Sequence, residues 1–488
     1  MKIKTAQDYL KSLRKLNHKV YYKGKRIKDV TRHPATAPHV RAAAVTYALA
    51  NDPEYKELAT AASHLTGKTV SRFTHVHRNA EDLIKKVKLL RVLGQKTGSC
   101  FQRCVGLDGI NAAYSVTYEI DQKCGTDYFE RFKKWLAYIQ EENLMVVGAM
   151  TDPKGDRSKG PAEQVDPDQY LRIVERRDDG LVIRGAKLHM TGGVNSHEIL
   201  IMPTTAMDEK SKDYAVVCAI PADAPGVTMI FGRQANDDRK DNRERIDSGN
   251  PVFGGVGGEA VIAFEDVFVP WERVFMNGET EFTNALVYRF AAHHRANYGG
   301  CKTGLIDVLT GAVTYLTQIQ GTAGASHVRD KVTEMIHLGE TLYSSSIACA
   351  AEGWPTPSGA YMVDTMLANV GKHNATRFHF EVARLAADLA GGFLATLPSE
   401  YDLNSEETGH LVKKYFSGVA GIPTEERIKI GRLIENMTGG TALVESMHGA
   451  GSPQAQRVMI FREGDLDKKV KLAKALAGIA PERSRKGA

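Results

Sequence analysis

The feature that most constrains the fold of this chain is a double change in its hydrophobic period. Up to about residue 144 apolar residues recur at i, i+3, i+4 and i+7, as in "AEDLIKKVKLLRVLGQ" (80–95) and "TDYFERFKKWLAYIQEEN" (126–143), which indicates amphipathic helices. Between about 145 and 275, six or seven short β-rich runs such as "YAVVCAI" are separated by turn residues. After "VPWERVF" the helical period returns. The order predicts an α+β protein with an N-terminal helical domain (1–144), a middle antiparallel β-domain (145–276) and a C-terminal helical bundle (277–488).

Composition and charge exclude several classes of protein. The net charge of +6 comes from 64 basic and 58 acidic residues that are mixed along the chain, so neither a nucleic-acid surface nor a membrane surface is indicated. No run of 18 apolar residues is available to span a bilayer, and the basic N-terminus lacks the apolar core of a secretory signal. Six cysteines are too few for a disulfide framework in 488 residues. We therefore expect a cytoplasmic protein with free or metal-bound thiols.

Residues 291–304, "AAHHRANYGGCKTG", collect reactive side chains in an apolar setting. On a helix, His294, Tyr298 and Cys301 share one face, with Lys302 at its edge, whereas His293 points elsewhere. The glycine pair at 299–300 lowers helix propensity but would let a bulky group approach the backbone. The alternative is a hydrogen-bonded core histidine beside a packed thiol.

A second segment, "GSCFQRCVG", brings two more thiols. Cys100 and Cys104 stand four apart, so on a helical turn their Cβ atoms would be about 5–6 Å apart. Together with His294 and Cys301 they form a candidate site of three cysteines and one histidine. Ligand softness permits zinc or an iron–sulfur cluster there, and the spacing does not choose between them.

Other polar clusters interrupt apolar stretches. The loop "MTDPKGDRSKGP" (150–161) is either a solvated surface loop or a phosphate-binding loop. The strand end "KLHMTGG" offers His189, Met190 and Thr191, which could satisfy local backbone groups or donate to a flavin or a substrate carbonyl. Glu259 heads a strand and Glu445 lies in an apolar helical run. Such a glutamate is either paired or has a raised pKa that suits acid–base chemistry.

Together these motifs resemble the 4-hydroxybutyryl-CoA dehydratase family, which is related to flavin-dependent 4-hydroxyphenylacetate 3-monooxygenases and shares the acyl-CoA dehydrogenase-like fold. The resemblance runs from "YLKSLRKLNHKVYYKGKRIKDVTRHP" through "TDPKGDRSKGP", "HHRANYGGCKTG" and "DLAGGFLATLPSEYD" to "SMHGAGSPQAQR". C-x3-C together with H-x6-C is its specific part, because the monooxygenase branch lacks a cluster.

The resemblance implies a homotetramer, a dimer of dimers, with one FAD and one [4Fe–4S] cluster per subunit. It implies conversion of 4-hydroxybutyryl-CoA to crotonyl-CoA and water through a radical, with vinylacetyl-CoA Δ-isomerase activity alongside. In that chemistry a base removes a C2 proton, the flavin accepts one electron, and hydroxide leaves towards the histidine-ligated iron, which acts as a Lewis acid.

Residue roles follow by position in the matching motifs. The implied cluster ligands are Cys100, Cys104, His294 and Cys301. The implied catalytic residues are Glu445, His294, Tyr298, Glu259, Lys302, Gln102 and Thr191. The implied flavin contacts are Asp152, Lys154, Gly155, Asp156, Arg157, His189, Met190 and Thr191, with Gly391 and Gly392 as a further contact. The CoA pocket carries no motif. Two other interpretations stay open: a flavin-dependent aromatic monooxygenase with incidental cysteines, and a non-catalytic zinc- or flavin-binding scaffold.

Overall fold

In the residues that the computed structural model describes (3–234, 238 and 245–479), six α-helices lie before residue 145. They are α1 (Ala6–Arg14), α2 (Ala37–Leu49), α3 (Lys56–Ala59), α4 (Ala80–Thr97), α5 (Cys104–Cys124) and α6 (Tyr128–Glu141). In α4 the Asn79 side chain accepts a hydrogen bond from the backbone of Asp82, and Gly98 ends the helix in the left-handed conformation at φ 56°. Helices α4 and α6 confirm those predicted at 80–95 and 126–143.

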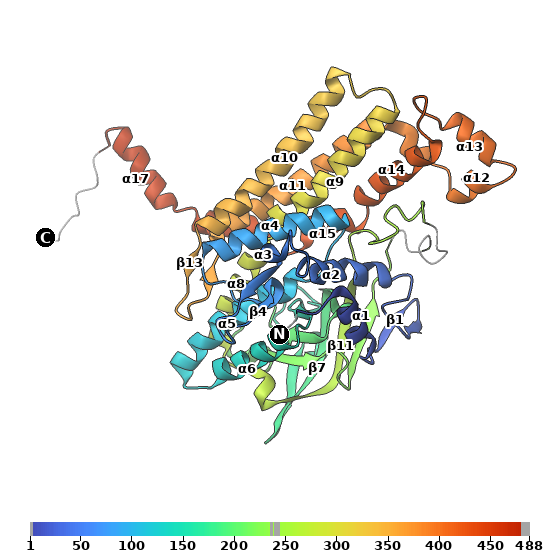
Figure 1. Cartoon of the computed structure of the whole chain (residues 1–488). Coiled ribbons are helices and arrows are strands. Elements are labelled where there is room, and N and C mark those ends of the chain that lie inside the picture. The colour runs from blue at the N-terminus through green and yellow to red at the C-terminus, as the bar shows by residue number, and fades with distance from the viewer. Residues whose placement is uncertain (1–2, 235–237, 239–244, 480–488) are drawn as a thin grey trace.

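Two sheets follow the predicted change of period (Figure 1). The six-stranded sheet has the order β2 (Lys25–Ile27), β1 (Val20–Tyr22), β10 (Val227–Phe231), β11 (Glu259–Pro270), β7 (Gly180–Thr191), β6 (Arg172–Arg176). The four-stranded sheet has the order β12 (Val274–Asn277), β9 (Val216–Pro221), β8 (Glu198–Ile201), β5 (Val146–Ala149). Two short hairpins, β3 (Thr60–Ala62) with β4 (Thr69–Ser71) and β13 (Trp354–Pro355) with β14 (Tyr361–Met362), lie outside these sheets.

The pairing departs from the prediction in two places. Most neighbouring strands are antiparallel as expected, but β1 pairs with β10 and β5 pairs with β8 in the parallel sense. Strands β1 and β2 also come from the segment that was expected to be helical, and they extend the six-stranded sheet. Strands of three residues carry too little alternation to be recognised in the sequence. The domain limits at 144 and 276 remain a prediction.

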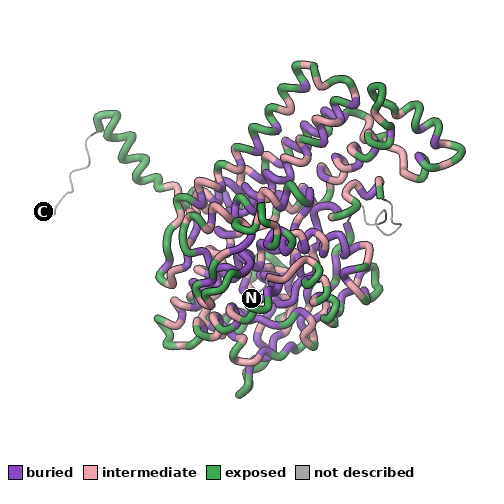
Figure 2. Tube along the Cα trace, viewed as in Figure 1, coloured by how far each residue is buried: buried purple, intermediate pink, exposed green. Residues whose placement is uncertain are grey.

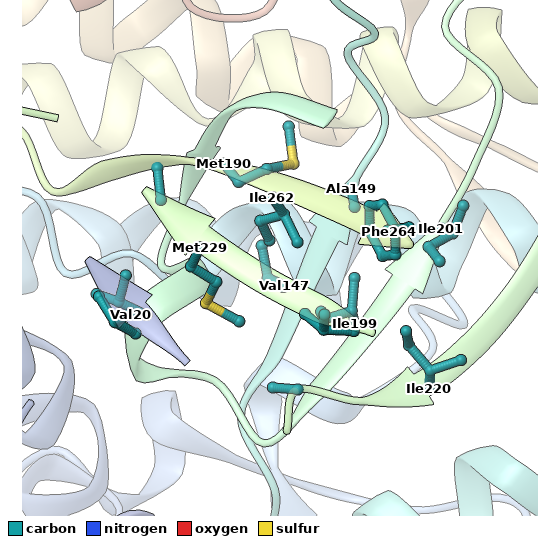
Figure 3. Packing of buried hydrophobic residues seen from close by; sticks show 14 of the residues in the cluster. Val20, Val147, Ala149, Met190, Ile199, Ile201, Ile220, Met229, Ile262 and Phe264 are labelled. Atoms are coloured by element: carbon teal, nitrogen blue, oxygen red, sulfur yellow. The ribbon is translucent and has the colours of Figure 1, made fainter. Parts of the chain in front are cut away.

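The two sheets enclose one apolar core (Figure 3). Val147 and Ile199 of the four-stranded sheet meet Ile262 of the six-stranded sheet, and all three side chains are buried. Because both inner faces contribute side chains to a single cluster, the sheets pack face to face.

Helices return after β12 and continue through the C-terminal half (Figure 1). They are α8 (Thr283–Ala296), α9 (Tyr298–Ile319), α10 (Ser326–Ala351), α11 (Thr365–Ala390), α12 (Glu400–Asn404), α13 (Gly409–Tyr415), α14 (Thr424–Met437), α15 (Thr441–His448), α16 (Pro453–Glu463) and α17 (Leu466–Leu476). The long helices α9, α10 and α11 pack together and bury their facing sides, whereas α17 is exposed throughout (Figure 2). Within the described part of the chain, no helix is both long enough and apolar enough to cross a membrane.

Candidate functional site

The three candidate cysteine ligands gather at the starts of two helices. Cys104 is the first residue of α5, Cys100 lies in the irregular segment before it, and Cys301 lies in the first turn of α9. Cys301 packs against the apolar cluster that contains Cys104, and both Cys100 and Cys301 act electrostatically on the Cys104 thiol. The predicted helical turn spanning Cys100 and Cys104 is wrong, because the left-handed backbone of Gln102 (φ 62°) precedes the helix.

The histidine segment is two helices rather than one. Helix α8 ends at Ala296 and α9 begins at Tyr298, with Asn297 between them. The His294 and Tyr298 rings nevertheless meet edge to face, with centroids 6.0 Å apart. His293 points away as predicted, since it is buried with its ring 6.0 Å from that of His77.

The glycine pair in this segment serves helix packing. A Cβ at Gly299 would lie 2.1 Å from the Ser346 hydroxyl, and one at Gly300 would lie 2.6 Å from the Val87 carbonyl oxygen. The prediction that these glycines leave room for a bulky group is therefore wrong. They bring α9 close to α10 and α4, which fixes the position of Cys301.

A buried carboxylate holds the His294 ring. Asp108 stands one turn after Cys104 in α5, and its Oδ2 accepts a hydrogen bond from His294 Nδ1 at 2.8 Å. Lys86 Nζ donates to the other Asp108 oxygen at 3.0 Å. Burial alone raises the pKa of Asp108, but Lys86 and His294 together hold it below its ordinary value. Through Asp108 the thiol segment and the histidine segment meet.

On the other side of Tyr298 lies a second network, which contains Glu445. The Tyr298 hydroxyl donates to Glu445 Oε1 at 3.0 Å, and Lys302 Nζ donates to the other oxygen. Lys372 lies over the Tyr298 ring, 4.2 Å from its centroid, and donates to the Ser446 carbonyl oxygen at 2.5 Å. Burial lowers the pKa of Lys372 to about 7. This network ties α9, α11 and α15 together around one carboxylate.

Gly449, in the "SMHGAGSPQ" motif, allows this contact. A Cβ at this position would lie 2.0 Å from the Tyr298 hydroxyl oxygen, so a larger residue would displace the hydroxyl from Glu445. The motif therefore has a direct steric role at the site.

Glu259 and Thr191 meet at the ends of two paired strands. They face each other in the β11–β7 register, and the Thr191 hydroxyl lies 3.4 Å from Glu259 Oε1. Gln102 lies nearby but is fully buried, and its amide is used by the protein: it donates to the Gly257 carbonyl oxygen at 2.7 Å and accepts from Asn195 at 2.8 Å. Gln102 thus shapes the loop between the cysteines.

The two glutamates have opposite pKa shifts. Burial raises the pKa of Glu259 to about 7. Burial acts on Glu445 in the same sense, but Lys302, Lys372 and Tyr298 lower its pKa below the ordinary value. Glu259 is acted on by Glu445 and Cys100 by both, so all three lie in one electrostatic environment. A protonated and an ionised carboxyl group near neutral pH can serve as acid and base.

The candidate flavin residues include two that point into the protein, several in an accessible loop, and His189 at the end of β7. Asp152 turns inward to an ion pair with Lys187 at 2.8 Å, and Met190 is part of the core between the sheets (Figure 3). The remainder of the loop is accessible, with Gly155, Asp156 and Arg157 exposed. Partial burial, with Lys154 and His448 nearby, lowers the pKa of His189. The loop, the end of β7 and the end of α15 therefore converge.

Gly391 and Gly392 lie apart from these residues. They are exposed in the 3-10 helix η8 (Gly391–Thr396), at the C-terminal end of α11. At the α-helical rise of ~1.5 Å per residue they are roughly 28 Å along α11 from Lys372, which contacts Tyr298.

The four candidate ligands, three thiols and one imidazole, are donors of the kind that an iron–sulfur cluster takes. Among residues 3–234, 238 and 245–479, no three or more His, Cys, Asp or Glu side chains are arranged to hold one metal ion, as a zinc site requires. A four-iron cluster spreads its ligands over separate corners, and thiolates with an imidazole are suitable donors. Burial raises the pKa of the Cys301 thiol to about 12, although the Lys302 ammonium acts in the opposite sense. A bound metal would favour the thiolate. The N-termini of α5 and α9 also favour a group with negative charge.

Sequence reasoning missed three charged residues of the site: Lys86, Asp108 and Lys372. All three are buried, with exposed fractions of 1%, 0% and 0%. Asp108 lies in "CVGLDGINAAY", an apolar helical run. The criterion that singled out Glu445, a carboxylate inside an apolar run, would have found it.

Comparison with known proteins gives matches over almost the whole chain. Residues 5–276 match the family model described as 4-hydroxyphenylacetate 3-hydroxylase N terminal, and residues 283–478 match the one described as 4-hydroxyphenylacetate 3-hydroxylase C terminal. The 4-hydroxybutyryl-CoA dehydratase/vinylacetyl-CoA-Delta-isomerase of Clostridium aminobutyricum is 53% identical, with 97% of this chain and 99% of that protein covered.

Solved structures give the same pattern. An oxygen-tolerant archaeal 4-hydroxybutyryl-CoA dehydratase from N. maritimus superposes with a TM-score of 0.96 at 50% identity, covering 99% of this chain and 96% of the other. The oxygenase component of 4-hydroxyphenylacetate 3-monooxygenase complexed with FAD has a TM-score of 0.82 at 22% identity, covering 97% and 98%. Glutaryl-coenzyme A dehydrogenase superposes with a TM-score of 0.52 at 12% identity, covering 98% of each chain. This similarity concerns the fold alone, as expected for an acyl-CoA dehydrogenase-like chain.

Proposed function

The chain belongs to the 4-hydroxybutyryl-CoA dehydratase family, within the wider 4-hydroxyphenylacetate 3-hydroxylase family, and we propose that it converts 4-hydroxybutyryl-CoA to crotonyl-CoA and water. It is then a lyase that also isomerises vinylacetyl-CoA. Two observations support the proposal: Cys100 and Cys301 lie close enough to act on the Cys104 thiol, and His294 is bonded to Asp108, one turn after Cys104. Tyr298, whose ring meets that of His294, also donates to Glu445.

Cys100, Cys104, Cys301 and His294 would hold a [4Fe–4S] cluster, with the imidazole bound through Nε2 because Nδ1 is taken by Asp108. When bound, the cluster would supply a Lewis acid for the C4 hydroxyl, and FAD would supply the one-electron chemistry of a radical reaction. The thioester would lie between the cluster ligands and the strand ends that carry Thr191 and Glu259.

The two carboxyl groups suit the proton transfers. The reaction removes one proton from C2, one proton from C3 and hydroxide from C4, returns one proton to C4, and releases the other with the hydroxide as water. Glu445 is held ionised by Lys302 and Tyr298, so it suits acceptance of a proton. Glu259 has a pKa of about 7 and suits donation. His294 would become a further proton acceptor only when its Nε2 is released from iron, because Nδ1 already carries the proton donated to Asp108.

FAD would lie against the loop and strand end that carry the candidate flavin residues. Lys154, Gly155, Asp156, Arg157, His189 and Thr191 supply accessible polar groups there, whereas Asp152 and Met190 act by shaping the backbone. Gly391 and Gly392 are far along α11, so we assign them to the flavin of a neighbouring subunit.

We further propose a cytoplasmic homotetramer arranged as a dimer of dimers. Helix α17 stands away from the rest of the chain (Figure 1), and its large apolar side chains are exposed: Leu466 by 48%, Val470 by 51%, Leu472 by 57% and Leu476 by 91%. A surface of this kind is typical of subunit contacts.

The test is the cofactor content and activity of protein purified without oxygen. We expect about four irons and four acid-labile sulfides per chain, one FAD, and formation of crotonyl-CoA from 4-hydroxybutyryl-CoA. One zinc per chain without activity would instead favour the scaffold interpretation. Iron-free protein that consumes oxygen with reduced flavin would favour the monooxygenase.

A further inference from the structure

Asp108 is the most heavily bonded carboxylate beside the candidate cluster ligands. Three donors reach it: Lys86 Nζ from α4 at 3.0 Å, His294 Nδ1 from α8 at 2.8 Å, and Nδ2 of Asn297, the residue between α8 and α9, at 2.6 Å. Asp108 has no exposed surface and the Lys86 side chain is 2% exposed. Lys86 also reaches the carbonyl oxygen of His293 at 3.4 Å, so it ties α4 to the end of α8.

The position of this network argues for a role beyond stability. A buried ion pair is weak support for a fold, because apolar residues of similar volume stabilise as well or better. Here the ion pair of Lys86 and Asp108 also bonds the His294 imidazole. Since an ionised carboxylate only accepts hydrogen bonds, Nδ1 of His294 must carry the proton, and Nε2 is the nitrogen with a free lone pair.

The ring is also held from two sides. Phe290 stacks on His294 with centroids 5.6 Å apart, and Tyr298 meets it edge-on at 6.0 Å. The His294 side chain is 12% exposed, and among the described residues no hydrogen bond to Nε2 is found. Contacts within the protein therefore fix the tautomer and the orientation of the His294 ring, and they leave its Nε2 available as a ligand.

We propose that Asp108, itself held by Lys86, is the positioning residue that presents Nε2 of His294 to iron; this rests on the proposed function. A histidine ligand whose second nitrogen donates to a carboxylate is a more basic and better oriented ligand. Lys86 supplies the positive charge that keeps this carboxylate inside the protein. Both side chains are buried, so we assign them a positioning role and not a contact with substrate.

The experiment compares three variants with wild type, all purified anaerobically: Asp108→Asn, Lys86→Met, and Arg432→Met. The last is a matched control, because Arg432 forms another buried ion pair, with Asp247 at 3.2 Å, on α14. The readouts are iron per chain, the ⁵⁷Fe Mössbauer spectrum, and kcat and KM for 4-hydroxybutyryl-CoA. In the spectrum an iron bound by nitrogen is distinguishable from irons bound only by sulfur.

In Asp108→Asn and Lys86→Met we expect the nitrogen-ligated iron to change its spectrum or be lost, so that iron falls from about four towards about three per chain. We expect kcat to fall roughly 10- to 100-fold, with little change in KM. Lys86→Arg should restore the spectrum in part. Arg432→Met should keep the wild-type spectrum.

Other outcomes reject the proposal. Iron-replete wild type with an unchanged spectrum in Asp108→Asn removes the positioning role and leaves the proposed function intact. Wild type without iron removes both. If Asp108→Asn and Lys86→Met yield no folded protein while Arg432→Met does, the network serves folding, and positioning is rejected.

Discussion

At the scale of single residues, Glu259 and Glu445 show how position divides two chemically identical groups. Glu259 begins β11, and the Thr191 hydroxyl is its one side-chain hydrogen-bond partner among residues 3–234, 238 and 245–479, so burial dominates and its pKa rises to about 7. Glu445 meets Lys302 and Tyr298, which outweigh burial. The sequence supplied the alternatives, a paired carboxylate or one with a raised pKa. Glu445 is the paired carboxylate because Lys302, at the edge of the predicted helical face, contacts it. Glu259 is the one with the raised pKa.

We expect Glu259→Gln to stabilise the protein at pH 8 and to change its stability little at pH 5. The pKa of this group is raised from 4.5 to about 7 on folding, so the folded state holds the proton more tightly. The contribution of Glu259 to stability is therefore greatest at low pH and declines between pH 4.5 and 7. The difference corresponds to about 3 kcal/mol at most. Thermal unfolding of both proteins from pH 5 to 8 measures it, and parallel curves would contradict the raised pKa.

A second residue-scale prediction concerns the thiols. Cys301→Ala should lose the cluster and with it at least about 100-fold of the dehydratase activity, since metal ligands at such a site are not interchangeable with water. Cys218→Ala is the matched control, because Cys218 is buried in β9 in the core between the two sheets and is not a candidate ligand. Iron content and visible spectra of both variants decide the matter. Activity retained in Cys301→Ala would remove the cluster assignment.

At the scale of elements, the hydrophobic period predicted the type of the long helices and strands. Long segments such as α4, α6 and β11 have many residues of consistent pattern, so their type could be read from the sequence. Strands β1 and β2, and the break at Asn297, could not, because tertiary contacts decide three-residue strands and single-residue kinks. The close approach of α9 to its neighbours was also missed. A glycine pair reads as flexibility unless the packing partner is known.

This helix crossing gives an element-scale prediction. A Cβ at Gly304 of α9 would lie 2.3 Å from the Arg91 carbonyl oxygen of α4, whereas at Gly311 of the same helix nothing lies within 4 Å. Gly304→Ala should therefore destabilise by about 1–3 kcal/mol and displace Cys301, lowering iron content. Gly311→Ala should stabilise by up to about 1 kcal/mol through helix propensity alone. Calorimetry and iron analysis of both test this, and equal effects would rule out the steric account.

At the scale of the whole molecule, the candidate site depends on all three parts of the chain. The loop before α5 carries Cys100 and α5 begins with Cys104, β7 and β11 bring Thr191 and Glu259, and the C-terminal bundle brings His294, Cys301 and Glu445. Sequence motifs identified these members, but their partners Asp108 and Lys372 come from helices that looked like ordinary core. Only the assembled fold shows that His294 is bonded by Asp108 of α5, whereas Glu445 is bonded by Tyr298 and Lys302 of α9.

The same scale carries the prediction about assembly. If α17 packs against a second copy, the double variant Leu472→Glu, Leu476→Glu should convert the tetramer to smaller species, because burying two unpaired carboxylates in an apolar contact is strongly unfavourable. Lys471→Ala, on the same exposed helix, should leave the tetramer intact. Light scattering coupled to size-exclusion chromatography gives the mass of each.

If Gly391 and Gly392 contact a neighbour's flavin, the smaller species should also lose FAD while keeping iron, since the proposed cluster ligands lie within one chain. A tetramer unaffected by the two glutamates would place the subunit contacts elsewhere, and loss of iron in step with FAD would show that the cluster too depends on assembly.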